Sequence, residues 1–265
     1  SASNYSISSA NFDITQRPLT LVGSKIYDGN TTIQGSQITT FTNIVGSETL
    51  SVSGSGTVSS ANVGNAKTLS TSGLSLVDNS GLASNYSIAS ASSNITQRPL
   101  NLSGSRAYDS TRTASGSDLS FTNIVSGETL GLTGSGVLDS PAAGGRTIVN
   151  TNTLAISDGS GIASNYTLTS GTFDVTARPI SLSGSRTYDG STTVSNSNLS
   201  TFTNIVSGEA LAITGSGTIV DKNVGSSKAV TLGTLALADN TATASNYSLN
   251  SATLNVTQRP LNIAA

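Results

Sequence analysis

The sequence predicts an all-β chain, built as a tandem array of three small antiparallel β-sandwich domains of the Ig-like type. One observation is a long repeat, because four Arg-Pro pairs recur at spacings of 81, 80 and 81 residues. A second is the alternation of apolar and polar residues in short runs, as in half-buried strands. A third is that no segment sustains the 3.6-residue period of an amphipathic helix. About six or seven short strands in each repeat, with turn signals between them, are typical of a small sandwich.

The repeat is long enough for each copy to form a domain of its own. Its spacing exceeds the 20–50 residues of a solenoid repeat, whose copies bury no core alone. We therefore expect domains at residues 18–98, 99–178 and 179–259. Residues 1–17 match the tail of a preceding repeat and residues 260–265 match the start of a following one, so we expect a segment of a longer array.

The strands can be placed in order along each repeat. Leu19-Thr20-Leu21-Val22 alternates directly after Pro18, and proline is tolerated at the first position of a strand. In the third repeat, Gly-Ser-Gly at 215–217 joins two apolar runs and predicts a hairpin or a tight bend. A long alternating stretch at 229–237 follows, and residues 247–257 form the closing strand.

A β-grasp arrangement is the alternative fold. It requires a helix near residues 195–206, where Ser, Thr and Asn fill the sequence. These residues are poor helix formers. The sandwich is therefore the preferred prediction.

The Arg-Pro pairs mark the inter-domain junctions. The closing strand of one repeat runs into the first strand of the next with no Gly/Ser linker, and a residue before proline is held in an extended conformation. We therefore expect short, stiff links and an elongated rod. The junction residues are Arg17, Pro18, Arg98, Pro99, Arg178, Pro179, Arg259 and Pro260.

The composition excludes several classes of function. Charged residues make up 10% of the chain, against about 25% in ordinary domains, and the net charge is -2. Disordered chains combine low hydrophobicity with high net charge, so this chain is expected to fold. Without a basic patch we expect no nucleic-acid partner, and without a run of 18 apolar residues we expect no membrane insertion of this fragment.

An enzyme is not expected. The chain has no histidine, and its carboxylates are dispersed singly, whereas acid-base catalysis uses histidine or a pair of carboxylates with shifted pKa values. Glu48, Glu128 and Glu209 recur once per repeat, as exposed-looking turn residues that make no dyad. We therefore predict no catalytic residues.

Several motifs in a fixed order carry a family resemblance. Lys25-Ile26-Tyr27-Asp28-Gly29-Asn30-Thr31-Thr32 and its copy at 186–193, with the later segments 220–225 and 244–249, resemble the YDG-type repeats of large secreted bacterial adhesins related to filamentous haemagglutinin. The second repeat departs from the pattern at Ser110 and at 140–144, where we expect turns of different construction. The resemblance implies an extracellular module, secreted or on the bacterial cell surface, that serves cell adhesion or biofilm formation and has no catalytic site.

The recurring Tyr-Asp and Asn-Tyr pairs are the candidate structural motif of each repeat. A sugar-binding or calcium-binding patch is one interpretation of Tyr-Asp-Gly. The preferred one is a turn, in which Asp caps the backbone, Gly takes a positive φ and Tyr packs under the loop with its hydroxyl at the surface. Each Asn-Tyr pair fits the N-glycosylation pattern, but a turn asparagine before a buried tyrosine is preferred. The residues are Tyr27, Asp28, Tyr108, Asp109, Tyr188, Asp189, Asn85, Tyr86, Asn165, Tyr166, Asn246 and Tyr247.

No cofactor is expected, and the candidate metal is calcium. Calcium takes six to eight oxygen ligands, usually from several carboxylates close together. The sequence shows no acidic cluster at a junction. The aspartates near predicted strand ends are Asp13, Asp78, Asp158, Asp174 and Asp239.

The expected function is that of a structural stalk, which projects the adhesive region of a surface or secreted adhesin. The alternative is a multivalent, weak glycan-binding or self-associating module, since linked weak sites gain strength by repetition. An ice-binding surface is a weaker alternative. Threonine is plentiful, but no regular Thr-x-Thr ladder runs along the sequence. The expected partners are neighbouring repeats of the same chain. Surface glycans, or copies of the chain pairing through exposed strand edges, are alternative partners.

Overall fold

The computed structural model describes residues 2–7 and 9–262. Within them the secondary structure consists of β-strands and short 3-10 turns, which confirms the predicted all-β class and the tandem arrangement. The chain packs as two compact units. One comprises Ser1–Leu100, Asn123–Leu130 and Asp158–Thr167, and the other comprises Asn101–Thr122, Gly131–Ser157 and Leu168–Ala265. The division passes through the second repeat, so the contacts between successive repeats lie inside a unit.

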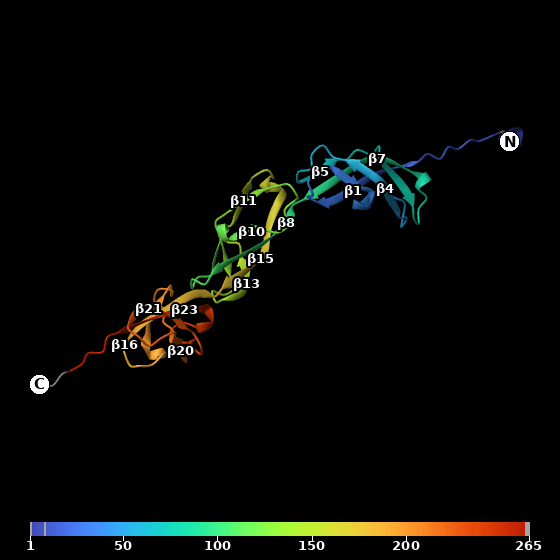
Figure 1. Ribbon diagram of the computed structural model, residues 1–265. Helices are drawn as coiled ribbons and strands as arrows, with labels where there is room; N and C mark the ends of the chain where they lie inside the picture. The colour runs from blue at the N-terminus through green and yellow to red at the C-terminus, as the bar shows by residue number, and fades with distance from the viewer. Residues whose placement is uncertain (1, 8, 263–265) are drawn as a thin grey trace. The chain divides into compact units, whose positions relative to one another are not determined.

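The first repeat forms two sheets. Their strand orders are β3-β1-β7-β5 and β2-β4-β6, and Figure 1 shows β1, β4, β5 and β7 together in the blue-to-green part of the chain. The strands are β1 (Arg17–Ile26), β2 (Thr32–Gln34), β3 (Ile38–Thr42), β4 (Leu50–Thr57), β5 (Gly64–Thr68), β6 (Leu74–Asp78) and β7 (Tyr86–Thr96).

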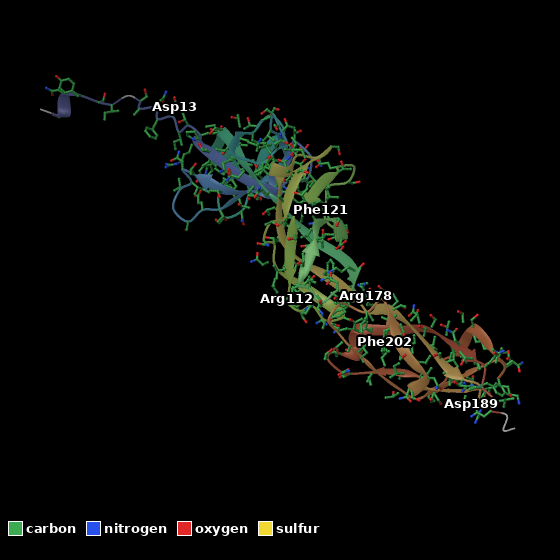
Figure 2. All side chains as sticks on the ribbon, turned by 90° about the vertical axis from the view of Figure 1, so that its left-hand side faces the viewer. Asp13, Arg112, Phe121, Arg178, Asp189 and Phe202 are labelled. Atoms are coloured by element: carbon green, nitrogen blue, oxygen red, sulfur yellow. The ribbon has the colours of Figure 1, made fainter. Side chains whose placement is uncertain are left out.

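The third repeat, in the second unit, has the same plan. Its strand orders are β17-β20-β21-β23-β16-β18 and β19-β22, and Figure 1 draws this part of the chain from yellow-orange to red. Figure 2 labels Arg178 on β16 and Phe202 on the neighbouring β18. The strands are β16 (Arg178–Thr187), β17 (Thr193–Ser195), β18 (Leu199–Thr203), β19 (Ala212–Thr214), β20 (Ser216–Ile219), β21 (Gly225–Thr231), β22 (Ala236–Ala238) and β23 (Tyr247–Thr257).

The second repeat repeats this strand succession. β8 pairs with β10, and β13 pairs with β12 and β15, while β12 also pairs with β9. Its strands are β8 (Arg98–Ala107), β9 (Thr113–Ser115), β10 (Leu119–Phe121), β11 (Leu130–Thr133), β12 (Ser135–Leu138), β13 (Gly144–Asn150), β14 (Ala155–Asp158) and β15 (Tyr166–Thr176).

The first and last strands of a repeat run parallel, so the prediction of a purely antiparallel sandwich is wrong in this respect. Arg17 pairs with Tyr86 at one end of the β1–β7 ladder, and Ile26 pairs with Thr96 at the other. β16 and β23 pair in the same way. Alternation with a period of two is common to both strand directions, so the sequence pattern could not distinguish them. Because of this pairing, the chain enters each of these repeats at one end and leaves at the opposite end.

The Gly-Ser-Gly segment is a bend between sheets and not a hairpin. β19 pairs with β22, whereas β20, two residues later, pairs with β17 and β21. Gly215 between them has φ +76°, and a Cβ there would lie 2.0 Å from the carbonyl oxygen of Thr234. Only glycine meets both conditions, because a side chain would be strained and would also clash with the backbone.

The helix required by the β-grasp alternative is not formed. Residues Asn196–Asn198 make a single 3-10 turn, and β18 begins directly after it. The alternating stretch predicted at 229–237 is likewise interrupted, since β21 ends at Thr231 and Gly233 has φ +56°.

Each repeat buries the alternate residues of its strands. In the first, Leu19 and Leu21 of β1, Ile33 of β2 and Ile95 of β7 are almost completely buried. In the second unit, one apolar cluster contains residues of two repeats, from Leu102 and Phe173 to Ile180, Leu211 and Tyr247. Successive repeats within that unit therefore share apolar contacts as well as the chain that joins them.

Candidate functional site

The Tyr-Asp-Gly segment of the first repeat is a turn closed around a buried cation. The side chain of Lys25 is 2% exposed, and its Nζ donates to Asp28 Oδ1 at 2.7 Å and to the carbonyl oxygens of Asn30 at 2.6 Å and Thr32 at 3.0 Å. Asp28 also accepts the Asn30 N–H at 2.9 Å, and Gly29 has φ +78°. Burial alone would raise the pKa of Asp28, but the hydrogen bonds from Lys25 and Asn30 outweigh burial and leave this pKa lowered.

Arginine replaces this lysine in the other repeats without changing the turn. Arg106 donates to the carbonyl oxygens of Thr111 at 2.7 Å and Thr113 at 3.1 Å, and Asp109 accepts the Thr111 N–H at 2.8 Å. Ser110 stands where the other repeats have glycine and takes φ +64°. The expectation of a differently built turn at Ser110 is therefore wrong.

In the third repeat the turn is also closed by an arginine, Arg186. Arg186 donates to the carbonyl oxygens of Ser191 and Thr193 and lies 3.5 Å from Asp189. Asp189, labelled in Figure 2, accepts the Ser191 N–H at 2.9 Å.

The tyrosine of this turn connects the first repeat to the second. Tyr27 is 5% exposed, and its hydroxyl donates to Oε1 of Glu128 at 2.5 Å. The other oxygen of Glu128 accepts the hydroxyl of Tyr166 at 2.6 Å, and the two rings meet edge to face with centroids 5.4 Å apart. We call Tyr27, Glu128 and Tyr166 the first triad. The prediction that the hydroxyl lies at the surface is wrong, because it is used between repeats.

A second triad, of Tyr108, Glu209 and Tyr247, connects the second repeat to the third. Glu209 accepts the hydroxyl of Tyr108 at 2.7 Å and that of Tyr247 at 2.5 Å. The rings are again edge to face, 5.4 Å apart. Two independent copies of the same arrangement, built by residues at equivalent positions, indicate a specific contact.

The asparagine before the second tyrosine of each triad adds a further bond. Asn165 is 1% exposed, and its side-chain oxygen accepts the N–H of Val63 at 2.9 Å while its amide donates to Asn62 at 3.0 Å. Asn246 accepts the N–H of Ala143 at 2.8 Å. The Asn-Tyr pair therefore acts as one contact element, and a buried, hydrogen-bonded amide is a poor acceptor for a glycan.

The Arg-Pro pair completes each junction. A single residue, Gln97, separates β7 from β8. Arg98 donates to the carbonyl oxygen and the side chain of Asn123, both at 2.7 Å, and reaches the carbonyl oxygen of Tyr27 at 3.4 Å. Arg178 makes the corresponding contacts with Asn204 at 2.6 Å and Tyr108 at 3.2 Å.

The prolines of three Arg-Pro pairs accept hydrogen bonds at their carbonyl oxygens, and of the two outermost pairs only the first makes the arginine–asparagine contact within the described residues. The carbonyl oxygens of Pro18, Pro99 and Pro179 each accept a side-chain amide, from Asn43, Asn123 and Asn204 respectively. Arg17 bonds to Asn43 in the same way as Arg98 bonds to Asn123. Arg259 and Pro260 are exposed and follow the end of β23.

The triads keep their phenols protonated. Burial, followed by the hydrogen bond to the glutamate carboxylate, raises the pKa of Tyr27, Tyr108, Tyr166 and Tyr247 to about 12. A neutral hydroxyl donating to a carboxylate is a charge-assisted hydrogen bond, which is stronger than one between neutral groups. The arrangement is suited to holding two repeats together.

The outer copies of the motif form only part of a triad. Tyr86 is buried and donates its hydroxyl to Glu48, and the Val45 N–H donates to that hydroxyl at 3.2 Å. Tyr188 is half-buried, and its backbone N–H donates to Thr257. In the described part of the chain, neither tyrosine has an edge-to-face partner of the kind seen in the two triads.

The glutamates are the residues that sequence reasoning missed. Glu48, Glu128 and Glu209 are half-buried, and Glu128 and Glu209 each accept two phenols, so the interpretation as exposed turn residues is wrong. A signal was present. Each glutamate precedes the tyrosine of an Asn-Tyr pair by 38 residues, so it recurs in step with the tyrosines.

The aspartates that are candidate calcium ligands either bond to other groups or lie apart from one another. Asp78, Asp158 and Asp239 each accept a backbone N–H at 2.7 Å, from Ala83, Ala163 and Ala244. Asp174 lies in β15, and Asp13 precedes β1 (Figure 2). Among residues 2–7 and 9–262, no three acidic, histidine or cysteine side chains gather as a metal site would require. Over the same residues, no helix is long and apolar enough to cross a membrane.

Comparison with known proteins identifies a family. The YDG domain matches three times, at residues 14–93, 94–173 and 174–254, which together span most of the chain. Neither the curated proteins nor the solved structures include a match.

Proposed function

Because the chain belongs to the YDG-domain family, we propose that its three YDG domains are a structural stalk of a bacterial cell-surface or secreted adhesin. In this role the repeats project an adhesive region for attachment or biofilm formation. The observation that carries the proposal is the pair of triads, because two buried, charge-assisted contacts fix successive repeats to each other.

The course of the chain also supports a spacer. The parallel pairing of β1 with β7 brings the chain in at one end of the repeat and out at the other. Gln97 alone then separates β7 from the next strand, and Arg98 is held by Asn123. A flexible Gly/Ser linker would leave neighbouring repeats free to turn, whereas this link leaves little freedom.

The same contacts favour a spacer over a multivalent glycan-binding module. A repeated binding site needs the same exposed aromatic and amide groups in each copy. At both junctions these groups are instead buried between repeats, as Asn165 and Tyr166 at the first and Asn246 and Tyr247 at the second.

Small-angle X-ray scattering of the full chain tests the spacer. We expect a maximum dimension above about 100 Å for three repeats end to end, unchanged by calcium or a chelator. In a Glu128→Ala/Glu209→Ala double variant, we expect a broader distribution of distances, because both triads are lost. Glu48→Ala is the matched control, since within residues 2–7 and 9–262 Glu48 accepts a hydrogen bond from one tyrosine, Tyr86. A compact particle, a dimension that depends on calcium, or a double variant identical to the control would contradict the proposal.

Immunolabelling tests the cellular context. Antibodies raised against the chain should label intact, unpermeabilised cells of the producing bacterium, or the matrix around them. Labelling that appears only after lysis would contradict the location at the cell surface or outside the cell. The spacer role would then apply to a protein of another compartment.

A further inference from the structure

Each triad brings two phenol rings together at their hydroxyl ends. Tyr27 and Tyr166 donate to different oxygens of one carboxylate, at 2.5 and 2.6 Å. The two hydroxyls therefore meet at one carboxylate, and the edge of one ring is directed at the face of the other. The centroid separation of 5.4 Å is within the 4.5–7 Å range of aromatic rings in contact.

We propose that the triads are sites of oxidative modification, in which Tyr27 couples to Tyr166 and Tyr108 couples to Tyr247 as dityrosine. The residues of each pair are far apart in sequence and belong to successive repeats, so each cross-link would staple one repeat to the next. The inference goes beyond the stalk proposal, and does not depend on it.

The coupling balances as a two-electron oxidation. A one-electron oxidant removes one electron from each phenol, and the phenolic protons leave toward the glutamate carboxylate and then solvent. The two phenoxyl radicals form one carbon–carbon bond between positions next to the oxygens. Each joined carbon then loses its proton and each oxygen regains one, so the product has lost two hydrogen atoms. With peroxide as the terminal oxidant, two water molecules form.

The glutamate is a positioning residue for this step. Its carboxylate orients both hydroxyls and lies within hydrogen-bond distance to accept a proton as an electron departs. Proton acceptance by a nearby base makes phenol oxidation easier, because it avoids a protonated phenol radical cation. The second triad offers the same geometry at Glu209.

Burial directs the outcome toward the neighbouring ring. The rings of Tyr27 and Tyr166 are nearly inaccessible, so a radical formed there cannot meet a second protein molecule. Tyr5, at the other extreme, is exposed and couples only by collision between molecules. Coupling in the triads should therefore be independent of protein concentration.

The positions of the lysines and arginines allow each dityrosine cross-link to be identified from tryptic peptides. Trypsin cleaves after Lys and Arg except before proline, and this places the seven tyrosines in seven different peptides. The first cross-link joins the peptides 26–67 and 147–186, and the second joins 107–112 and 229–265. Linked peptides identified by mass spectrometry thus report the coupled pair directly.

The experiment oxidises the full chain with a photochemically generated one-electron oxidant, tris-bipyridyl ruthenium with persulfate, over a range of protein concentrations. We expect the two triad cross-links to form first, each with the loss of two hydrogen atoms and in a yield independent of concentration. Tyr27→Phe should abolish the first cross-link and leave the second, which serves as an internal control.

A second variant separates proton acceptance from structure. In Glu128→Gln we expect the yield of the first cross-link to fall severalfold relative to the second, with near-ultraviolet circular dichroism of the tyrosines unchanged. The proposal is overturned if dityrosine forms only between molecules, or if tyrosines outside the triads couple while the triad pairs do not. An unchanged ratio in Glu128→Gln would remove the role given to the glutamate.

Discussion

At the scale of single residues, the first repeat carries a polar side chain in its core. Ser93 of β7 is 0% exposed, and within the described residues its hydroxyl has no hydrogen-bond partner. The equivalent positions in β15 and β23 hold Phe173 and Leu254, both fully buried. A buried hydroxyl without a partner loses its hydration and gains nothing in return.

We therefore expect Ser93→Ala to stabilise the chain. Removing the unpaired hydroxyl should raise the free energy of unfolding by about 1 kcal/mol, measured by denaturant titration. Ser92→Ala on the same strand is the control, because Ser92 is only partly buried and its replacement should have little effect. Loss of stability in Ser93→Ala would show that the hydroxyl has a partner in solution.

Ser110 and Gly190 allow a matched test of backbone strain. Both occupy the same turn position, at φ +64° and φ +78°. A non-glycine residue pays about 1–2 kcal/mol in this conformation, and the greater freedom of glycine in the unfolded chain offsets part of the difference. Ser110→Gly should therefore stabilise by up to about 1 kcal/mol. Gly190→Ser should destabilise by a similar amount through backbone strain alone, since no atom of the described residues lies within 4 Å of the added Cβ. Equal stability of all three chains in thermal unfolding would refute the strain.

At the scale of elements, strands and turns follow from local patterns, but their partners do not. The alternation of Leu19 and Leu21 predicts β1, and Tyr-Asp-Gly predicts the turn after it. The parallel partner β7 begins about a whole repeat later and is invisible to a pattern shared by both strand directions. Glu128 is 101 residues from Tyr27, so only its recurrence in step with the tyrosines could have linked the two.

The first triad predicts a measurable coupling between two elements of different repeats. Tyr27→Phe removes a hydrogen bond to a charged acceptor and should cost about 1.5–3 kcal/mol of stability in the repeats that it joins. In a double-mutant cycle with Glu128→Gln, the two losses should not add, because both remove the charge assistance from the same bond. Tyr188→Phe is the control, since among the described residues Tyr188 belongs to neither triad. Strict additivity, measured by chemical unfolding, would mean that the triad contributes no coupling.

At the scale of the whole molecule, contacts between neighbours make the array more than a string of independent domains. The apolar cluster that runs from Phe173 to Leu211 and Tyr247 belongs to two repeats, and the triads add polar bonds at both junctions. Stability in such an array is the sum of the repeats and of the interfaces between neighbours. A change that weakens the junctions should therefore lower the stability of every repeat that shares one.

Alkaline pH is such a change, because it acts on both triads at once. The four triad phenols have a pKa of about 12 in the folded chain, against 10.0 for the unperturbed side chain. Between these values the folded chain binds more protons than the unfolded chain, so the free energy of unfolding falls as pH rises. Below pH 10 the stabilisation is fully present, and it is lost as pH passes through about 12. A deprotonated phenol beside a glutamate carboxylate converts a hydrogen bond into repulsion between like charges.

We expect tyrosinate absorbance to show a late-titrating group of tyrosines, whose ionisation coincides with loss of the far-ultraviolet β signal. In Glu128→Gln/Glu209→Gln this step should move to lower pH, because the carboxylates that help to raise the pKa are gone. Titration of the four triad tyrosines near pH 10, with the fold intact, would show that the glutamates do not hold their hydroxyls in solution.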